Sequence, residues 1–65
     1  MDLNWITAEV ETTETIFQAG PGGSGRRHLN AQIALDNGFV HIKDPDSDGI
    51  WILPAGSLIT ALYKP

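Results

Sequence analysis

The sequence has no cysteine, few basic residues and no long hydrophobic run, and each absence excludes a class of protein. Without cysteine among its 65 residues, the chain has neither disulfides nor thiolate metal sites. A formal net charge of −4 argues against broad binding to nucleic acid, which needs a basic surface. No run approaches the ~18 apolar residues of a membrane span, so we expect no membrane partner. The start of the chain, MDLNWITAEV, lacks the pattern of a signal peptide, and we therefore expect a cytoplasmic protein.

The length of the chain allows one domain, which we place over residues 1–65. A domain of this size buries only ~60% of the surface that its unfolded chain exposes, so it needs additional support. Disulfides are excluded and we expect no cofactor, which leaves association with copies of the chain or a very well packed core. Because 42% of the residues are hydrophobic and two are tryptophan, we expect the chain to associate with copies of itself.

Alternation of apolar and polar residues predicts strands, and no window has the 3.6-residue period of a helix. The clearest alternating segments are residues 6–11, 29–36 and 39–43. Between the last two stands Asn37-Gly38, the preferred pair for a two-residue hairpin turn because both positions need positive φ. Residues 15–18 fit either a short strand or the arm of a long loop, and residues 20–25 (GPGGSG) are predicted to be loop.

The end of the chain, GIWILPAGSLITALYKP, is its most informative segment. A β-rich apolar run stops at Pro54, a turn of small residues follows, and a second β-rich run occupies residues 58–63. Together with the earlier strands, this ending predicts an all-β fold. The expected architecture is a five-stranded small barrel like the Src-homology-3 domain, with a short 3-10 turn before the last strand.

Basic residues gather at one place, where Arg26, Arg27 and His28 follow the glycine-rich segment. Arginines beside free backbone amides can bind phosphate or carboxylate. With Lys43 they are our candidates for binding an anion or RNA. The alternative is that they offset nearby glutamates or keep a loop soluble, since surface ion pairs are common and contribute little.

Acidic residues alternate in the turn of residues 44–49, where Asp44, Asp46 and Asp48 precede Gly49. Carboxylates at alternate positions can converge on calcium, so these three are candidate ligands. However, the twelfth position of such a loop is Ala55 in place of a bidentate glutamate. A polar hairpin turn is the favoured interpretation.

Large aromatic residues on the strands are candidates for a contact surface. Trp51 has isoleucine on both sides, so one of its strand's faces is expected to be exposed in a lone barrel. Trp5, Trp51 and Tyr63 are therefore predicted at an interface between subunits. We expect no catalysis, because no nucleophile lies near a histidine in the sequence.

Two stretches resemble the Sm-like family, which includes the bacterial Hfq proteins. LNAQIALDNGFVHIK is similar to its first motif, and the segment from Ile50 to Tyr63 is similar to its second. The resemblance implies a five-stranded Src-homology-3-type barrel whose last strand pairs with a neighbouring subunit to form rings, which often bind RNA. The ending also resembles that of type II dihydrofolate reductase, although Ile50–Leu53 lacks the polar groups which that active site uses.

The sequence therefore predicts a non-catalytic, self-associating β-barrel that acts as an assembly or protein-interaction module. An Sm-like RNA-binding protein is the first alternative. A barrel that binds a small molecule or calcium is the second.

Overall fold

Strands make up nearly all the regular structure in the computed structural model, which describes residues 3–20 and 23–64. No helix in this described part is long and hydrophobic enough to span a bilayer. In chain order, the elements are β1 (Ile6–Thr12), β2 (Phe17–Gly20), β3 (Gly23–Gly25), β4 (Arg27–Asp36), β5 (Phe39–Lys43), β6 (Ile50–Pro54), the 3-10 turn η1 (Ala55–Ser57) and β7 (Leu58–Tyr63).

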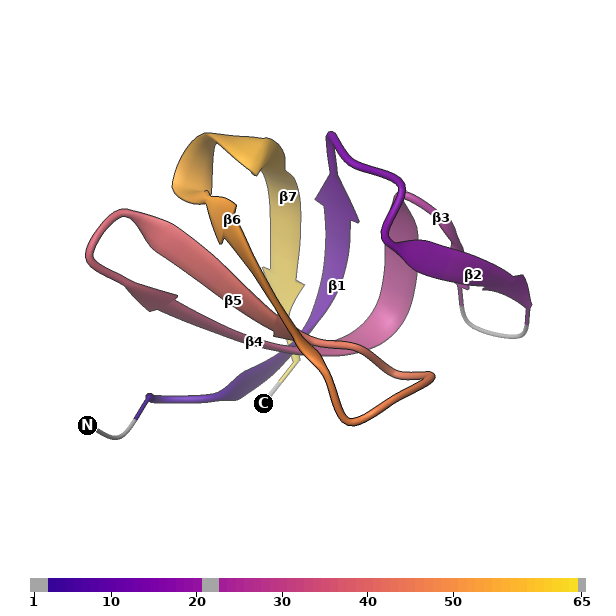
Figure 1. The fold of residues 1–65 in the computed structure, drawn as a ribbon, viewed down its shortest axis with the longest axis horizontal. Helices are drawn as coiled ribbons and strands as arrows, with labels where there is room; N and C mark the ends of the chain where they lie inside the picture. Colours follow the sequence, from indigo (N-terminus) through magenta and orange to yellow (C-terminus); the bar gives the residue numbers. More distant parts are fainter. Residues whose placement is uncertain (1–2, 21–22, 65) are drawn as a thin grey trace.

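The strands form one antiparallel sheet that curls but does not close (Figure 1). Its main path runs β6-β5-β4-β1-β7, and the small β2-β3 hairpin attaches to the first residues of β4. Among the described residues no ladder joins β6 to β7, although η1 connects them directly. The all-β prediction and the 3-10 turn are thus confirmed. The prediction of a closed barrel is wrong, because the two edge strands of the sheet, β6 and β7, do not pair with each other among the described residues.

The glycine-rich segment corrects a second prediction. We expected residues 20–25 to be loop, but Gly20 pairs with Gly23 in a short ladder that also joins Phe17 to Gly25. Pairing of this kind uses only backbone groups, so it needs none of the β-branched side chains by which strands are recognised. Pro21 and Gly22, the rest of that prediction, lie outside the described residues.

The hairpin between β4 and β5 follows its sequence signal. Asn37 and Gly38 have φ values of 52° and 79°, the left-handed region that a two-residue turn of this type requires. This turn sets the register in which Leu35 faces Val40 and Ile33 faces Ile42. The predicted hairpin is confirmed.

The core lies on the inner face of the curled sheet. Alternate residues of β1, β4 and β5 point inward, so that each of these strands contributes two apolar side chains to one cluster. Leu53 and Leu58 pack against this cluster from the terminal strands. The cluster consists of Ala8, Val10, Ile16, Phe17, Ala31, Ile33, Val40 and Ile42.

A β-bulge interrupts the ladder between β1 and β4. Ala8 faces Ala31 but Val10 faces His28, so β4 carries one extra residue between these pairs. Such a bulge bends the strand that contains it. The bend lets the first part of β4 pair with β3 and the last part with β5.

We predict that Ile33→Ala lowers the free energy of unfolding by about 2–5 kcal/mol, because it empties part of the core. The Ile33 side chain is 1% exposed. Leu35→Ala on the same strand is the matched control, since Leu35 is 63% exposed and its truncation should cost less than about 1 kcal/mol. Urea denaturation followed by tryptophan fluorescence measures both. Equal losses would contradict this assignment of the core.

Candidate assembly surface

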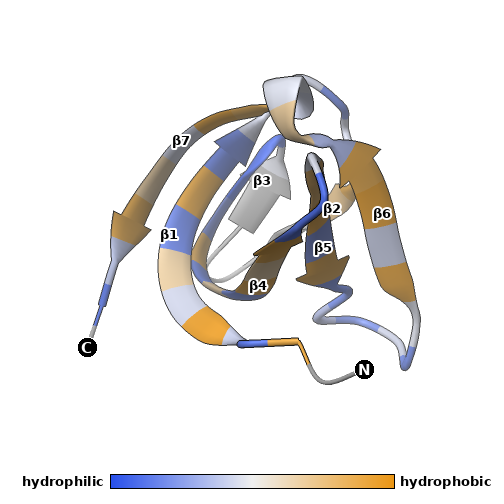
Figure 2. Ribbon diagram, turned by 90° about the vertical axis from the view of Figure 1, so that its left-hand side faces the viewer, coloured by the Kyte–Doolittle hydropathy of each residue, from blue (hydrophilic) through white to orange (hydrophobic). Residues whose placement is uncertain are grey.

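The last two strands carry hydrophobic side chains that the rest of the chain leaves exposed. Figure 2 shows β6 and β7 without strongly hydrophilic residues, whereas β1 alternates between hydrophilic and hydrophobic. Ile52 is 59% exposed, Leu62 62% and Tyr63 58%. We call these residues the terminal-strand surface: Ile50, Trp51, Ile52, Ile59, Leu62 and Tyr63.

Both faces of these two strands contribute to the terminal-strand surface. Residues paired across neighbouring strands point to the same face. Trp51 pairs with the buried Ile42 and so faces inward, while Ile52 pairs with His41 on the outer face. On β7, Tyr63 pairs with the buried Ala8 and faces inward, and Leu62 pairs with Glu9 on the outer face. Strands with apolar residues on both faces are normally covered on both faces.

Each terminal strand also has one edge without a strand beside it. Within the described residues, β6 pairs only with β5 and β7 only with β1. Free edges present rows of backbone N–H and C=O groups that can pair with another chain. The chain therefore combines unpaired edges with uncovered apolar side chains at the same two strands.

The three predicted interface aromatics separate in the structure. Trp51 and Tyr63 belong to the terminal-strand surface. Trp5 precedes β1, and the Lys43 ammonium lies 4.7 Å from the centroid of one of its rings. This cation–π contact joins the segment before β1 to the end of β5.

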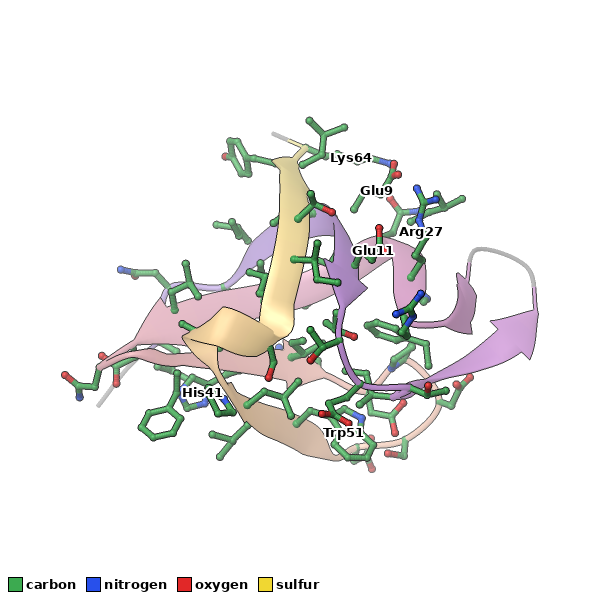
Figure 3. All side chains as sticks on the ribbon, turned by 90° about the horizontal axis from the view of Figure 1, so that it is seen from above. Glu9, Glu11, Arg27, His41, Trp51 and Lys64 are labelled. Carbon is green, nitrogen blue, oxygen red and sulfur yellow. The ribbon has the colours of Figure 1, made fainter. Side chains whose placement is uncertain are left out.

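The predicted basic cluster does not form a single patch. Arg27 faces outward, and its Nη2 lies 3.1 Å from Oε2 of Glu9, which also has Nζ of Lys64 3.9 Å from its other oxygen. Figure 3 shows Arg27, Glu9 and Lys64 together, on the side of the molecule away from His41 and Trp51. Arg26 is exposed, and its backbone carbonyl accepts a hydrogen bond from the N–H of Thr12.

His28 has a structural position on the other face of β4. Its register partner is the buried Val10, and its ring lies 5.3 Å from that of Phe17. Its Nδ1 accepts a hydrogen bond of 3.1 Å from the backbone N–H of Asn30, inside the β-bulge. His28 thus satisfies an amide that the bulge removes from the ladder. Because side chains alternate along a strand, Arg27 and His28 cannot bind one ligand from one face.

The acidic turn holds itself together with hydrogen bonds. The Asp44 carboxylate accepts hydrogen bonds from the backbone N–H of Asp46 and from the Ser47 hydroxyl, both at 3.0 Å. The Ser47 Oγ in turn accepts from the N–H of Gly49 at 3.1 Å. No group of three His, Cys, Asp or Glu side chains that could hold a metal ion occurs in residues 3–20 and 23–64. These hydrogen bonds favour the interpretation as a polar hairpin turn, and the calcium site stays a prediction.

Two hollows among the described residues are slightly smaller than a usual ligand site. One of about 270 Å³ lies along β1 and β7, where Glu9, Glu11 and Arg27 line it together with Leu62. Another of about 290 Å³ lies beside Trp51 and the acidic turn. Pockets for small molecules usually hold about 300–1,000 Å³ and enclose most of their ligand. Polar groups at both hollows are engaged with one another, since Arg27 forms an ion pair with Glu9 and the Ser47 hydroxyl donates to Asp44.

Comparison of the chain with protein-family models, curated proteins and solved structures gave no match.

Sequence reasoning missed much of the terminal-strand surface. It selected the aromatic Trp51 and Tyr63 but passed over the aliphatic residues between and beside them. The signal was present, because IWIL and LITALY do not alternate between apolar and polar residues. A strand with one wet face alternates, and these two do not. The missed residues are Ile50, Ile52, Ile59 and Leu62.

We predict that Asp44→Ala lowers the free energy of unfolding by about 1 kcal/mol, because the turn loses both hydrogen bonds that Asp44 accepts. Asp48→Ala is the matched control, since the Asp48 carboxylate makes none of the hydrogen bonds of this turn and should change stability less. Millimolar calcium should leave the melting temperature of the unmodified chain unchanged in differential scanning calorimetry. A rise that Asp44→Ala abolishes would restore the calcium site.

Proposed function

We propose that this protein is a non-catalytic assembly module that associates with copies of itself through the terminal-strand surface. The observation that carries the proposal is the exposure of β6 and β7, which have apolar side chains on both faces and one free edge each. Large exposed apolar patches mark interaction sites. The chain has no cysteine for a disulfide, and a partner copy is one source of the support that a small core needs.

A Src-homology-3-like architecture fits this proposal. The last strand lies beside the first, and a 3-10 turn joins β6 to β7. Membership of the Sm-like family remains a prediction, supported by the motif resemblance and by this strand order.

The non-catalytic part of the proposal is supported by the roles of the reactive side chains. His28 is occupied at the bulge, and Ser47 is hydrogen-bonded within the acidic turn. His41 lies on the outer face, and its two register partners, Ala34 and Ile52, carry no carboxylate. Nucleophilic catalysis needs a base beside the nucleophile and a third group that orients it.

RNA binding has less support than self-association. Of the four predicted basic residues, Arg27 is paired with Glu9, His28 faces the core side and Lys43 contacts Trp5. Only Arg26 is left as an exposed cation without one of these assignments, and one cation gives little affinity for a phosphate backbone.

The proposal predicts a mass above that of the monomer in multi-angle light scattering, rising with protein concentration. The double variant Ile52→Glu with Leu62→Glu should be monomeric, because it places a charge on each terminal strand. Both residues are more than half exposed, so the fold should survive, as circular dichroism can check. Leu29→Glu is the matched control on β4 and should still associate. A monomeric unmodified chain, or a double variant that still associates, would refute the proposal.

A further inference from the structure

The hydrogen-bonding pattern of β7 identifies which backbone groups its free edge presents. In an antiparallel pair, hydrogen-bonded and non-hydrogen-bonded residue pairs alternate. The N–H of Lys64 donates to the carbonyl of Thr7 at 2.9 Å, which makes Lys64 and Thr7 a bonded pair. Leu62 and Glu9 are then also a bonded pair. The N–H and C=O groups of Ala61 and Tyr63 therefore point away from β1, to the free edge.

The free edge of β6 presents the backbone groups of alternate residues as well. The N–H of Asp44 donates to the carbonyl of Gly49, and the N–H of Ala55 donates to that of Gly38, both at 2.9 Å. Alternation between these two bonds leaves the groups of Ile50 and Ile52 at the free edge. Pro54 occupies the next edge position and has no N–H, which limits the pairing that β6 can offer.

We propose, on the basis of the self-association above, that two copies pair β7 against β7 in antiparallel orientation about a two-fold axis at Leu62. In this register Ala61 of each copy faces Tyr63 of the other. Their free groups then form four hydrogen bonds, and no group of these residues is left over. A register shifted in one direction would have to pair Ile59, which lies at the bulge where the β1-β7 register breaks. A register shifted in the other direction would need a residue beyond the end of β7.

The two faces of the sheet favour this pairing over one between β7 and β6. Bonded residues project their side chains to the same face. Ala61 and Tyr63 face inward, whereas Ile50 and Ile52 face outward. An antiparallel β7-β6 contact would thus continue the inner face of one copy as the outer face of the next. The β7-β7 contact joins the inner face of one copy to the inner face of the other, so that the two sheets become one continuous sheet.

The side chains along β7 are also complementary to themselves. Tyr63 lies beside the small Ala61 of the second copy on the inner face, and the two Leu62 side chains meet on the outer face. No charged residue occurs from Leu58 to Tyr63. Lys64 faces Thr60 of the second copy, and the neighbour of Thr60 on β1 is Glu11. No like charges are therefore paired across the axis.

A single introduced cysteine tests the register, because the chain has no cysteine of its own. Leu62→Cys places two thiols in a non-hydrogen-bonded pair, where Cα atoms lie about 4.5 Å apart and a disulfide can form. We expect mild oxidation to give a covalent dimer. Thr60→Cys is the control on the same face, since its thiols would be offset by four residues, roughly 13 Å. Equal cross-linking of the two variants would overturn the register.

Proline substitutions test which edge pairs. Ala61→Pro removes two of the four intermolecular hydrogen bonds and none of those between β7 and β1, so it should weaken dimerisation about tenfold or more. Ile52→Pro makes the same change at the β6 edge and should leave the dimer intact. If both variants are monomeric and folded, a β7-β6 ring is correct instead. If Ile52→Pro alone is monomeric, a β6-β6 contact is correct.

The outcomes separate this inference from the proposed function. A monomeric unmodified chain would refute both. An oligomer that resists Leu62→Cys cross-linking would refute only the β7-β7 pairing and leave self-association standing.

Discussion

The fold depends on β4, the strand that holds the two halves of the sheet together. It pairs with β1 along one edge, and on the other edge with β3 near its start and β5 near its end. The bulge between Ala31 and His28 bends this strand between the part that pairs with β3 and the part that pairs with β5. His28 supports that bulge by accepting the Asn30 N–H. A residue that sequence reasoning assigned to ligand binding is thus part of the framework.

Much of the fold could be predicted from the sequence because its signals are local. Asn37-Gly38 dictates a turn through the φ values it tolerates, and alternation places Ile33 and Val40 on the inner face. The β2-β3 hairpin could not be predicted in the same way. Its ladder is made by the backbone of glycines, which carry no pattern of side chains. Closure of the barrel could not be predicted either, because it depends on contacts between strands and not on the residues of any one strand.

The candidate site shows the same division between local and non-local information. Three consecutive basic residues suggested an anion site, but the pleat of β4 places the Arg27 and His28 side chains on opposite faces. Glu9 lies 18 positions from Arg27 in the chain and nevertheless forms its ion pair. Alternate acidic letters suggested a metal site, but the turn uses Asp44 for its own hydrogen bonds. Linear clusters of charge on strands and turns are therefore weak guides to function.

The open side of the sheet connects the small size of the chain to its proposed role. A curled sheet that closes needs no partner, because each edge satisfies the other. Here the two edges stay apart, and the strands beside the gap are the ones with apolar residues on both faces. Covering Leu62 and Tyr63 with a second copy would remove exposed apolar area and pair free backbone groups in the same step. The core and the assembly surface are then parts of one hydrophobic structure, of which a single chain supplies half.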